Sequence, residues 1–370
     1  MSGTNANFFP QWQILYNGVD ITQKFLESFK EIRYDEVIGG ETCQLKIYFS
    51  DWNYSMQNGP PSKGDFVEVS IGYKGQALTS CGTFEIDEFE LQGPPEIFII
   101  KCVEAGITGD LRTLNDYAYE NTSLTGIASQ VAGRHGWTPV TDAVSPDVHY
   151  DRITQNHESD LAFLKRIAGQ HNYEFQIRNN QLIFYNRLTL ENQPPSGTVD
   201  KLSNNVKLFR LHDQTLRHRA YKKAKVTYLD PNTKNLLSSE ATNINIPTGD
   251  LINSTERVEN SQQATAKAQS YLHEHNMLSQ VGEITLVGTM QYRAGTTVAL
   301  KNFGVFDNYI YIVDKARHIM NRMGYLTRLE LRTTLNANPA QPQKGKGAGV
   351  STVYVDPTTG RKYSLPGGGP

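Results

Sequence analysis

The sequence has few cysteines, and those that it has are far apart. Cys43, Cys81 and Cys102 each lie in an apolar stretch typical of a strand, and no C-x-x-C pair suggests a structural zinc site. We therefore expect three buried, reduced thiols. No segment approaches the roughly 18 apolar residues of a membrane span. The N-terminus lacks a basic region followed by an apolar run, so we expect no signal peptide, no membrane insertion and synthesis in a reducing host cytoplasm.

A dominant charge of one sign is also missing. The 36 Lys and Arg residues nearly balance the 38 Asp and Glu residues, giving a net charge of −2. This balance disfavours a free nucleic-acid-binding protein, but it leaves a locally charged surface such as a channel lining open. The 38% hydrophobic and 20% charged content fits a soluble globular protein. A chain of 370 residues exceeds what one hydrophobic core usually serves, so two or more domains are expected.

Motifs of catalysis are absent as well. The sequence has no Gly-rich phosphate loop, no G-x-S-x-G elbow and no H-E-x-x-H. The run His273-Glu274-His275 falls on a predicted helix, where positions two apart face different ways and cannot share a metal, so it indicates a solvated helix end. His149, Asp151 and His157 are close in the sequence but lack a supporting motif. We therefore expect no active site, no metal and no cofactor.

Two charged groups have an alternative functional interpretation. Glu88 and Glu90 lie on one face of a predicted strand and could form a glycosidase pair, although an exposed strand face or a channel lining is favoured. The basic runs Arg217-His218-Arg219 and Lys222-Lys223 precede a predicted strand at 224–228. They could meet a partner or a phosphate backbone, but they are more typical of a solvated strand edge guarded by charge.

Alternating apolar and polar residues mark strands in the first hundred residues. Trp12, Ile14 and Tyr16 alternate before an Asn17-Gly18 turn. Further alternating stretches lie at 45–49, 64–72, 82–91 and 97–103. Short strands at regular spacing predict an all-β unit, either a small barrel or a sandwich.

The pattern changes at residue 105. Ser123 is expected to cap a helix whose apolar face carries Leu124, Ile127, Ala128 and Val131 and which ends at Gly136. A short strand at 137–140 and two strands joined at Asn179-Asn180 complete a predicted compact α+β insertion.

The segment Ile153–Phe175, ITQNHESDLAFLKRIAGQHNYEF, predicts a helix followed by a strand. Ser159 is a suitable N-cap, Asp160 stands in the first turn, and Asn172 is a suitable left-handed stop. The alternation over Tyr173–Ile177 then indicates a strand with one buried face.

Strands return from residue 206. The stretch from Ala224 to Ser238 predicts a hairpin with a turn at Asp230-Pro231-Asn232-Thr233, and a helix is expected at 261–277. Strands then resume at Val281 and extend to Leu335.

Two β segments share the order and spacing of their motifs. In the first, G-D-x-V-x-V leads to F-E-I-D-E and then to a further strand; in the second, G-T-x-V-x-L leads to Y-I-V-D-K and then to a further strand. These motifs start at Gly64, Phe84 and Phe98 and at Gly295, Tyr311 and Tyr325. The last two starting points are 14 residues apart in both segments (98 − 84 and 325 − 311). We infer that one barrel occurs twice in the chain.

The residues of segment 153–175 also carry a resemblance. The order I-T-Q, E-S-D-L-A-F-L-x-R-I-A and Y-x-F resembles the phage late-control D family, the baseplate hub proteins of contractile-tailed phages. It is also similar to the hub portion of VgrG spike proteins in type VI secretion. The resemblance extends more loosely from about residue 10 to residue 335.

The resemblance implies a mechanical role. In the family, two similar barrels per chain, assembled as a homotrimer, present six barrels in a ring that adapts a six-fold tail tube to a three-fold spike. The implied partners are a separate central spike protein, a tail tube or tube-initiator protein and other baseplate proteins, with DNA or cargo only in transit through the lumen. The implied location is the tail baseplate of a virion or injection particle. Phage, tailocin and other contractile injection systems remain open.

The expected fold class is α+β, mainly β, with two similar antiparallel β-barrel domains and inserted α+β and helical segments. The expected divisions are a hub barrel at 1–104, an inserted α+β domain at 105–200, a second hub barrel at 201–335 with a helical insertion at about 241–280, a linker at 336–350 and a C-terminal hairpin extension at 351–370.

The C-terminal extension lies outside the resemblance. Residues 351–365 predict a hairpin with a D-P-T-T-G turn, and because a lone hairpin is marginal in water, we expect it to pair with something else. Strand addition onto the spike or another baseplate protein is one such role. The candidate partner-binding residues are Tyr354, Val355, Arg361 and Tyr363.

Two rival functions belong to other classes. A cell-wall hydrolase using Glu88 and Glu90 predicts bond cleavage by the isolated chain, abolished by Glu88→Gln. A carbohydrate-binding β protein of a tail tip predicts saturable glycan binding and no self-assembly. Neither accounts for the duplicated segments or for the motif in 153–175.

Overall fold

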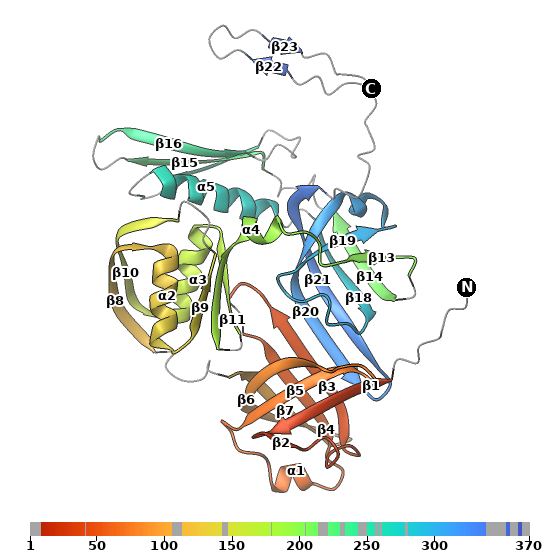
Figure 1. The fold of residues 1–370 in the computed structure, drawn as a ribbon. Coiled ribbons are helices and arrows are strands. Elements are labelled where there is room, and N and C mark those ends of the chain that lie inside the picture. Colours follow the sequence, from red (N-terminus) through yellow and green to blue (C-terminus); the bar gives the residue numbers. More distant parts are fainter. Residues whose placement is uncertain are drawn as a thin grey trace.

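The computed structural model places two β-rich bodies in one continuous sheet, with two further inserted segments packed beside them (Figure 1). The structure describes residues 9–40, 42–105, 113–142, 147–178, 180–203, 205–213, 221–229, 234–242, 250–255, 258, 261–277, 280–337, 353–355 and 362–364. Among these residues, no helix is long and apolar enough to cross a membrane.

The N-terminal body is built from seven strands and a short helix. They are β1 (Pro10–Tyr16), β2 (Val19–Asp20), β3 (Phe29–Val37), β4 (Gln44–Ser50), α1 (Ser55–Asn58), β5 (Phe66–Tyr73), β6 (Thr79–Gln92) and β7 (Ile97–Glu104). The sheet order is β3-β4-β7-β6-β5-β1-β2, and every pairing within it is antiparallel. The predicted Asn17-Gly18 turn is confirmed, because both residues have the positive φ that a two-residue hairpin turn requires.

All three cysteines lie in the hydrophobic core of this N-terminal body as free thiols, as predicted. Burial raises the pKa of Cys43 and of Cys102 to about 12, which keeps both thiols protonated and unreactive near neutral pH.

The C-terminal body has a core of its own. Its elements are β13 (Thr198–Asp200), β14 (Val206–Asp213), β18 (Gln280–Val287), β19 (Thr297–Lys301), the 3-10 helix η2 (Gly304–Asn308), β20 (Tyr309–Asn321) and β21 (Gly324–Ala337). The order is β14-β18-β21-β20, with β19 paired to β20 and β13 paired to β19. Since β20 also pairs with β3, the two bodies share one 13-stranded sheet. The expected fold class, α+β and mainly β, is confirmed, and the strands of the two expected antiparallel barrels belong to this shared sheet, in which β13 and β19 pair in parallel.

The first insertion packs helices α2 and α3 between two small sheets (Figure 1). Its elements are β8 (Leu114–Ser123), α2 (Leu124–Arg134), β9 (Thr138–Thr141), β10 (His149–Ser159), α3 (Asp160–Gln170), β11 (Tyr173–Arg178), β12 (Gln181–Asn186) and α4 (Arg187–Glu191). Both predicted N-caps are confirmed: Ser123 Oγ accepts a hydrogen bond from Gly126 N at 3.1 Å, and Ser159 Oγ accepts one from Ala162 N at 3.3 Å. The left-handed stop at Asn172 is also confirmed.

The prediction that β11 buries only one face is wrong. Every residue of Tyr173–Ile177 is buried. Phe175 O accepts a hydrogen bond from Gly40 N at 2.8 Å, and Gln176 Nε2 donates one to Val37 O at 3.2 Å. The strand is therefore covered by the N-terminal body as well as by its own insertion.

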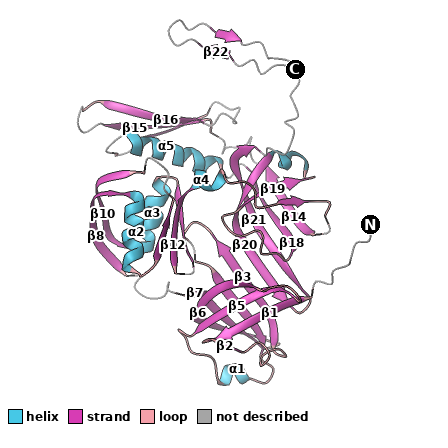
Figure 2. Ribbon diagram, in the orientation of Figure 1, coloured by secondary structure: helices cyan, strands magenta, loops and turns pink. Residues whose placement is uncertain are grey.

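The second insertion forms a separate three-stranded sheet covered by one helix. Its elements are β15 (Lys223–Leu229), β16 (Leu236–Thr242), β17 (Leu251–Thr255) and α5 (Ser261–Asn276). Their shared core includes Val226 and Leu272. The predicted pairing of β15 with β16 is confirmed, whereas the predicted turn at 230–233 lies outside the described residues. The segment inserted between β14 and β18 thus contains strands as well as the expected helix. Figure 2 shows that the longer helices lie in the two insertions.

The interpretation of Lys222-Lys223 as the guard of a strand edge is wrong. The strand that they adjoin, β15, is central in the order β16-β15-β17, and Lys223 Nζ lies 3.4 Å from Glu240 Oε2 on the neighbouring strand. The run Arg217-His218-Arg219 lies outside the described residues.

The C-terminal extension contains a two-stranded sheet of β22 (Val353–Val355) and β23 (Lys362–Ser364), with Tyr354 opposite Tyr363. This pairing fits the predicted hairpin. Its predicted turn, Arg361 and the predicted linker residues 338–350 lie outside the described residues.

Candidate assembly interface

Two glycines with the same backbone conformation begin the repeated motif. Gly64 and Gly295 both have φ +86°, which L-residues rarely adopt. Gly64 N donates to Ile86 O at 2.9 Å, and Gly295 N donates to Val313 O at 2.8 Å. Ile86 N in turn donates to Asp65 O, and Val313 N donates to Thr296 O, both at 2.9 Å. Ile86 and Val313 are the positions that the sequence motifs bring into register.

Five strands pair in the same order around these motifs in both bodies. We define the first β unit as β3-β4-β7-β6-β5 and the second β unit as β14-β18-β21-β20-β19. The pairing skips one residue at Lys30 in β3 and at Lys207 in β14. It also skips Asp87 in β6 and Asp314 in β20. Two bulges at matching places in two five-stranded units indicate one structural unit present twice.

One detail of the predicted register is wrong. The bulges place Lys101 and Glu330 at the same position, because Glu88 faces Lys101 and Lys315 faces Glu330. The sequence alignment, with its spacing of 14 residues, is therefore shifted by two in the third strand. The alignment fails there because the β6–β7 and β20–β21 hairpins differ in length. A shift of two residues leaves each side chain on the same face of the sheet, because side chains alternate along a strand.

The two β units meet where β20 pairs with β3, from Lys315 opposite Val37 to Asn321 opposite Glu31. Arg317 donates to both carboxylate oxygens of Asp35, at 2.6 and 2.9 Å. Burial alone would raise the pKa of Asp35, but the hydrogen bonds from Arg317 hold it below its ordinary value. Bidentate pairs of this kind are specific in geometry, and this one lies at the junction between two similar units.

A buried ionic cluster fixes the junction to the first insertion. Glu36 is fully buried, 2.9 Å from Arg293 Nε in the C-terminal body and 3.2 Å from Arg178 Nη2 in the insertion. Tyr34 Oη donates to it at 2.8 Å. Burial opposes ionisation, yet Arg293 and Arg178 hold the pKa of Glu36 below its ordinary value. The sequence prediction did not include this cluster, although Glu36 occupies the inward position that follows Ile32 and Tyr34.

A second cluster ties the insertion to β21. Glu174 Oε1 accepts hydrogen bonds from Arg187 at 2.6 Å and from Arg332 at 3.2 Å, and Arg332 also pairs with Asp314. Burial raises the pKa of Asp314 to about 6 in spite of that partner. The two clusters hold both β units and the first insertion in one arrangement.

Glu88 and Glu90, the alternative glycosidase pair, lie near the C-terminal end of β6. Lys101 Nζ bridges Glu88 at 3.0 Å and Glu90 at 2.6 Å, and the Glu88 side chain is 56% exposed. The hydrogen bond from Lys101 lowers the pKa of Glu90, whereas a glycosidase acid needs a raised pKa. This geometry fits the exposed strand face that the sequence favoured.

The prediction that the run 273–275 is a solvated helix end is wrong for its first residue. His273 is buried, and its Nε2 lies 3.0 Å from Glu191 Oε1, because α5 packs towards α4. His275 is exposed and lies on another face, as predicted. His149, Asp151 and His157 all belong to β10. Within the described part of the chain, no three His, Cys, Asp or Glu side chains are placed to hold a metal.

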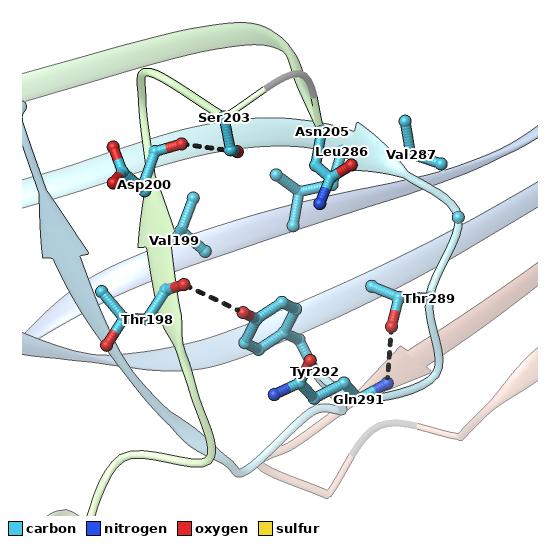
Figure 3. Close-up of a pocket in the computed structure, with 11 residues that line it drawn as sticks. Thr198, Val199, Asp200, Ser203, Asn205, Leu286, Val287, Thr289, Gln291 and Tyr292 are labelled. Carbon is cyan, nitrogen blue, oxygen red and sulfur yellow. Dashed lines mark hydrogen bonds between the residues drawn. The ribbon is translucent and has the colours of Figure 1, made fainter. Parts of the chain in front are cut away.

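A shallow pocket lies at the margin of the C-terminal body (Figure 3). Tyr292 Oη donates to Thr198 O at 3.4 Å, and Ser203 Oγ donates to Asp200 O at 2.7 Å. The only carboxylate in its lining, Asp200, accepts a hydrogen bond from Asn302 at 2.6 Å, which lowers its pKa. These contacts join β13 to its neighbours and present no acid–base pair.

Comparison with known proteins gives sequence relatives of one kind. The chain is 25% identical over 209 residues to a "Probable baseplate hub protein" of Escherichia phage 186, covering 55% of this chain and 53% of the relative. It is 28% identical over 175 residues to the protein of the same name from Escherichia phage P2, covering 47% and 45%. The chain thus spans about half the length of the curated relatives it matches. No family model matches the sequence.

Solved structures share the fold over most of the chain. The 43 kDa tail protein of prophage MuSo2 from Shewanella oneidensis aligns with a TM-score of 0.66 at 16% identity, over 87% of this chain and 98% of that protein. The Escherichia coli c3393 protein, a type VI secretion component described as structurally similar to T4 bacteriophage tail proteins, aligns with a TM-score of 0.53 at 12% identity, over 83% and 74%. The chain therefore has the fold of these tail and secretion proteins and is similar in sequence to the baseplate hub proteins of phages P2 and 186, as segment 153–175 predicted.

Proposed function

We propose that the chain is the baseplate hub of a contractile tail or injection particle and that it assembles as a homotrimeric ring. The observation that carries this proposal is the repeated β unit, with its matched glycines and matched bulges. Three chains with two units each present six similar units around one axis, while the whole assembly keeps three-fold symmetry. Such a ring joins a six-fold tube to a three-fold spike.

The insertions have a defined place in this proposal. Both insertions lie on the same side of the two β units (Figure 1). The ionic clusters at Glu36 and Glu174 fix the first insertion to both units, so that the two move together. We assign the β units to the ring around the lumen, through which DNA or cargo passes, and the insertions to a cup over the spike.

The partners in this proposal are a spike protein, a tail tube or tube-initiator protein and other baseplate proteins. The pairing of Tyr354 with Tyr363 in β22 and β23 supports a role for the C-terminal extension as a clamp by strand addition, with Val355 and Arg361 as further contact residues. Deleting residues 338–370 is expected to leave the ring intact and to weaken binding to one neighbour. Unchanged assembly of the complete baseplate would refute the clamp.

Electron microscopy of the purified chain tests the proposed ring directly. We expect end-on views with six similar densities around a central lumen and three-fold symmetry at the periphery, where the insertions lie. Particles without a central lumen, or rings with a number of units other than six, would overturn the proposal.

A further inference from the structure

Each β unit has one strand segment that lacks a neighbouring strand among the described residues, although the matching segment of the other unit has one. In the second unit, residues 315–321 of β20 pair with β3. The matching residues of β6, from Glu88 to Gln92, pair with β7 on one side, and no described strand pairs with them on the other. Likewise β14 is the counterpart of β3, and among the described strands it pairs with β18 alone.

The pairing of β20 with β3 within one chain predicts the register in which β6 of one copy would pair with β14 of another. The bulges match β6 to β20 and β14 to β3 position by position. The pair of Arg317 and Asp35 at the internal junction then corresponds to a pair of Glu90 and His212 at the junction between copies. By the same transfer Leu91 lies opposite Leu211, and Gln92 lies opposite Arg210.

The charges at this transferred junction are opposite to those at the internal one, and they remain complementary. At the internal junction the cations Lys315 and Arg317 are on β20 and the anion Asp35 is on β3; at the transferred one the anions Glu88 and Glu90 are on β6, and the basic residues His212 and Arg210 are on β14. The matched residues are Lys315 and Glu88, Arg317 and Glu90, Glu330 and Lys101, and Asp35 and His212. On β3 of another copy, Glu90 would face the like charge of Asp35, and on β14 Arg317 would find no carboxylate at the position of Asp35.

The apolar side chains on these segments are exposed where their counterparts are buried. Leu91 is 51% exposed, whereas its counterpart His318 is fully buried at the internal junction. Phe209 is 42% exposed, whereas its counterpart Ile32 is fully buried. Leu208, next to Phe209, is 63% exposed. Exposed apolar residues along a strand edge that no described strand covers are typical of an interface.

We propose that β6 of one copy pairs antiparallel with β14 of a second copy, in the register that places Glu90 opposite His212 and Gln92 opposite Arg210. Within one chain β18, β21, β20, β3, β4 and β7 lie between the two strands in the sheet, so the pairing joins separate copies. The contact is head-to-tail, and three such contacts alternating with three internal β20–β3 junctions close a ring of six units. This inference rests on the proposed trimer and adds the surface that holds it together.

The internal junction also identifies which positions suit a disulfide. Ile38 N donates to Asp314 O at 3.2 Å, so these two residues form a hydrogen-bonded pair. Alternation along the strands makes the positions of Asp35 and Arg317 a non-hydrogen-bonded pair, with closer side chains. By transfer, Gln92 and Arg210 form a non-hydrogen-bonded pair as well, within the reach of a disulfide.

The test mixes two separately purified full-length variants, Gln92→Cys and Arg210→Cys, under mild oxidation. We expect a covalent dimer in the mixture and little in either variant alone, and covalent trimers from the double variant. The matched control replaces Arg210→Cys with Leu211→Cys, whose side chain faces the opposite side of the sheet. The native cysteines are buried and do not compete.

Two outcomes would overturn the junction, and they are distinguishable. If the variants are trimeric by light scattering but the Gln92→Cys mixture crosslinks no better than the control, the strand pairing is wrong and the trimer stands. If the chain stays monomeric at every concentration and does not crosslink, both are wrong.

Charge exchange gives a second readout on the same contact. Glu90→Arg is expected to weaken self-association about tenfold or more, because it removes the carboxylate opposite His212 and adds repulsion from Arg210. Adding His212→Asp recreates the Arg317–Asp35 pair of the internal junction and should restore association. A double variant as weak as the single variant would contradict the register.

Discussion

The first and second β units share a backbone but differ in what covers their outer strands. In the first unit β3 is paired with β20, and Ile32, Tyr34 and Glu36 along it are buried. In the second unit the matching strand β14 is largely exposed, from Leu208 to Arg210. Residues that set the backbone conformation, such as Gly64 and Gly295, are the same in both units. Residues that contact a neighbouring strand differ between the units. A difference in burial between matching residues therefore indicates where a neighbouring strand covers one unit and not the other.

The largest expected difference between the units is at Glu36 and its counterpart Asp213. Glu36→Ala leaves Arg293 and Arg178 without their carboxylate in a buried site, so we expect a loss of about 3–5 kcal/mol in the free energy of unfolding. Asp213 accepts a hydrogen bond from Gln280 at an exposed site, and Asp213→Ala should cost no more than about 1 kcal/mol. Urea unfolding measures both. Equal losses would contradict the account of the internal junction.

Ile32 and Phe209 occupy matching positions and should differ next. Ile32 is fully buried, and Ile32→Ala should cost about 3 kcal/mol through the cavity it leaves. Phe209 is half-exposed and contacts Phe303 edge-on, with ring centroids 5.2 Å apart, so Phe209→Ala should cost about 1 kcal/mol in the isolated chain. A larger loss for Phe209 in urea unfolding of the isolated chain would show that β14 is already covered within one copy.

The pH dependence of stability is expected to differ because His318 has Leu91 as its counterpart. Burial lowers the pKa of His318 to about 4, despite the nearby Glu36 carboxylate and with Arg293 adding to the shift. Between pH 6.5 and 4 the unfolded chain binds a proton that the folded chain does not, so stability falls by about 3 kcal/mol as the pH falls through this range.

His318→Leu makes this position like that of the first unit. It is expected to flatten the pH dependence of unfolding between pH 6.5 and 4, measured by thermal unfolding at a series of pH values. His275→Leu, at an exposed site, is the matched control and should leave the slope unchanged. A slope unaffected by His318→Leu would contradict the account.

The smallest expected effect is the same in both units. Gly64→Ala and Gly295→Ala each force an L-residue to φ +86°, at a cost of about 1 kcal/mol. An added Cβ would meet only ordinary contacts, at 3.7 Å from Glu85 Oε1 and 3.4 Å from Ile38 Cγ2. Gly133→Ala, in α2 with open space, should stabilise instead. A clear difference between Gly64 and Gly295 in thermal unfolding would argue against structural equivalence.

Local signals were sufficient to predict much of the fold. The caps at Ser123 and Ser159, the Asn17-Gly18 turn and the left-handed Asn172 each depend on a few neighbouring residues, and all are confirmed. The repeat was predictable because the glycine at its start and the spacing from Phe84 onward are set by the backbone itself.

Contacts between distant segments were not predictable. The burial of both faces of β11 depends on Gly40 and Val37, which lie far away in the sequence. The burial of His273 depends on Glu191 in the other insertion. The sequence register already places Glu90 at the position of Arg317, but the pairing of Arg317 with Asp35 is seen only in the structure, because these two residues lie far apart in the sequence.

Light scattering of the purified full-length chain tests the central claim most directly. The account predicts a native mass of about 124.5 kDa, three times 41.5 kDa, in a particle whose strand pairing β6–β14 repeats at each contact between copies. A mass of 41.5 kDa that persists at high protein concentration would contradict it.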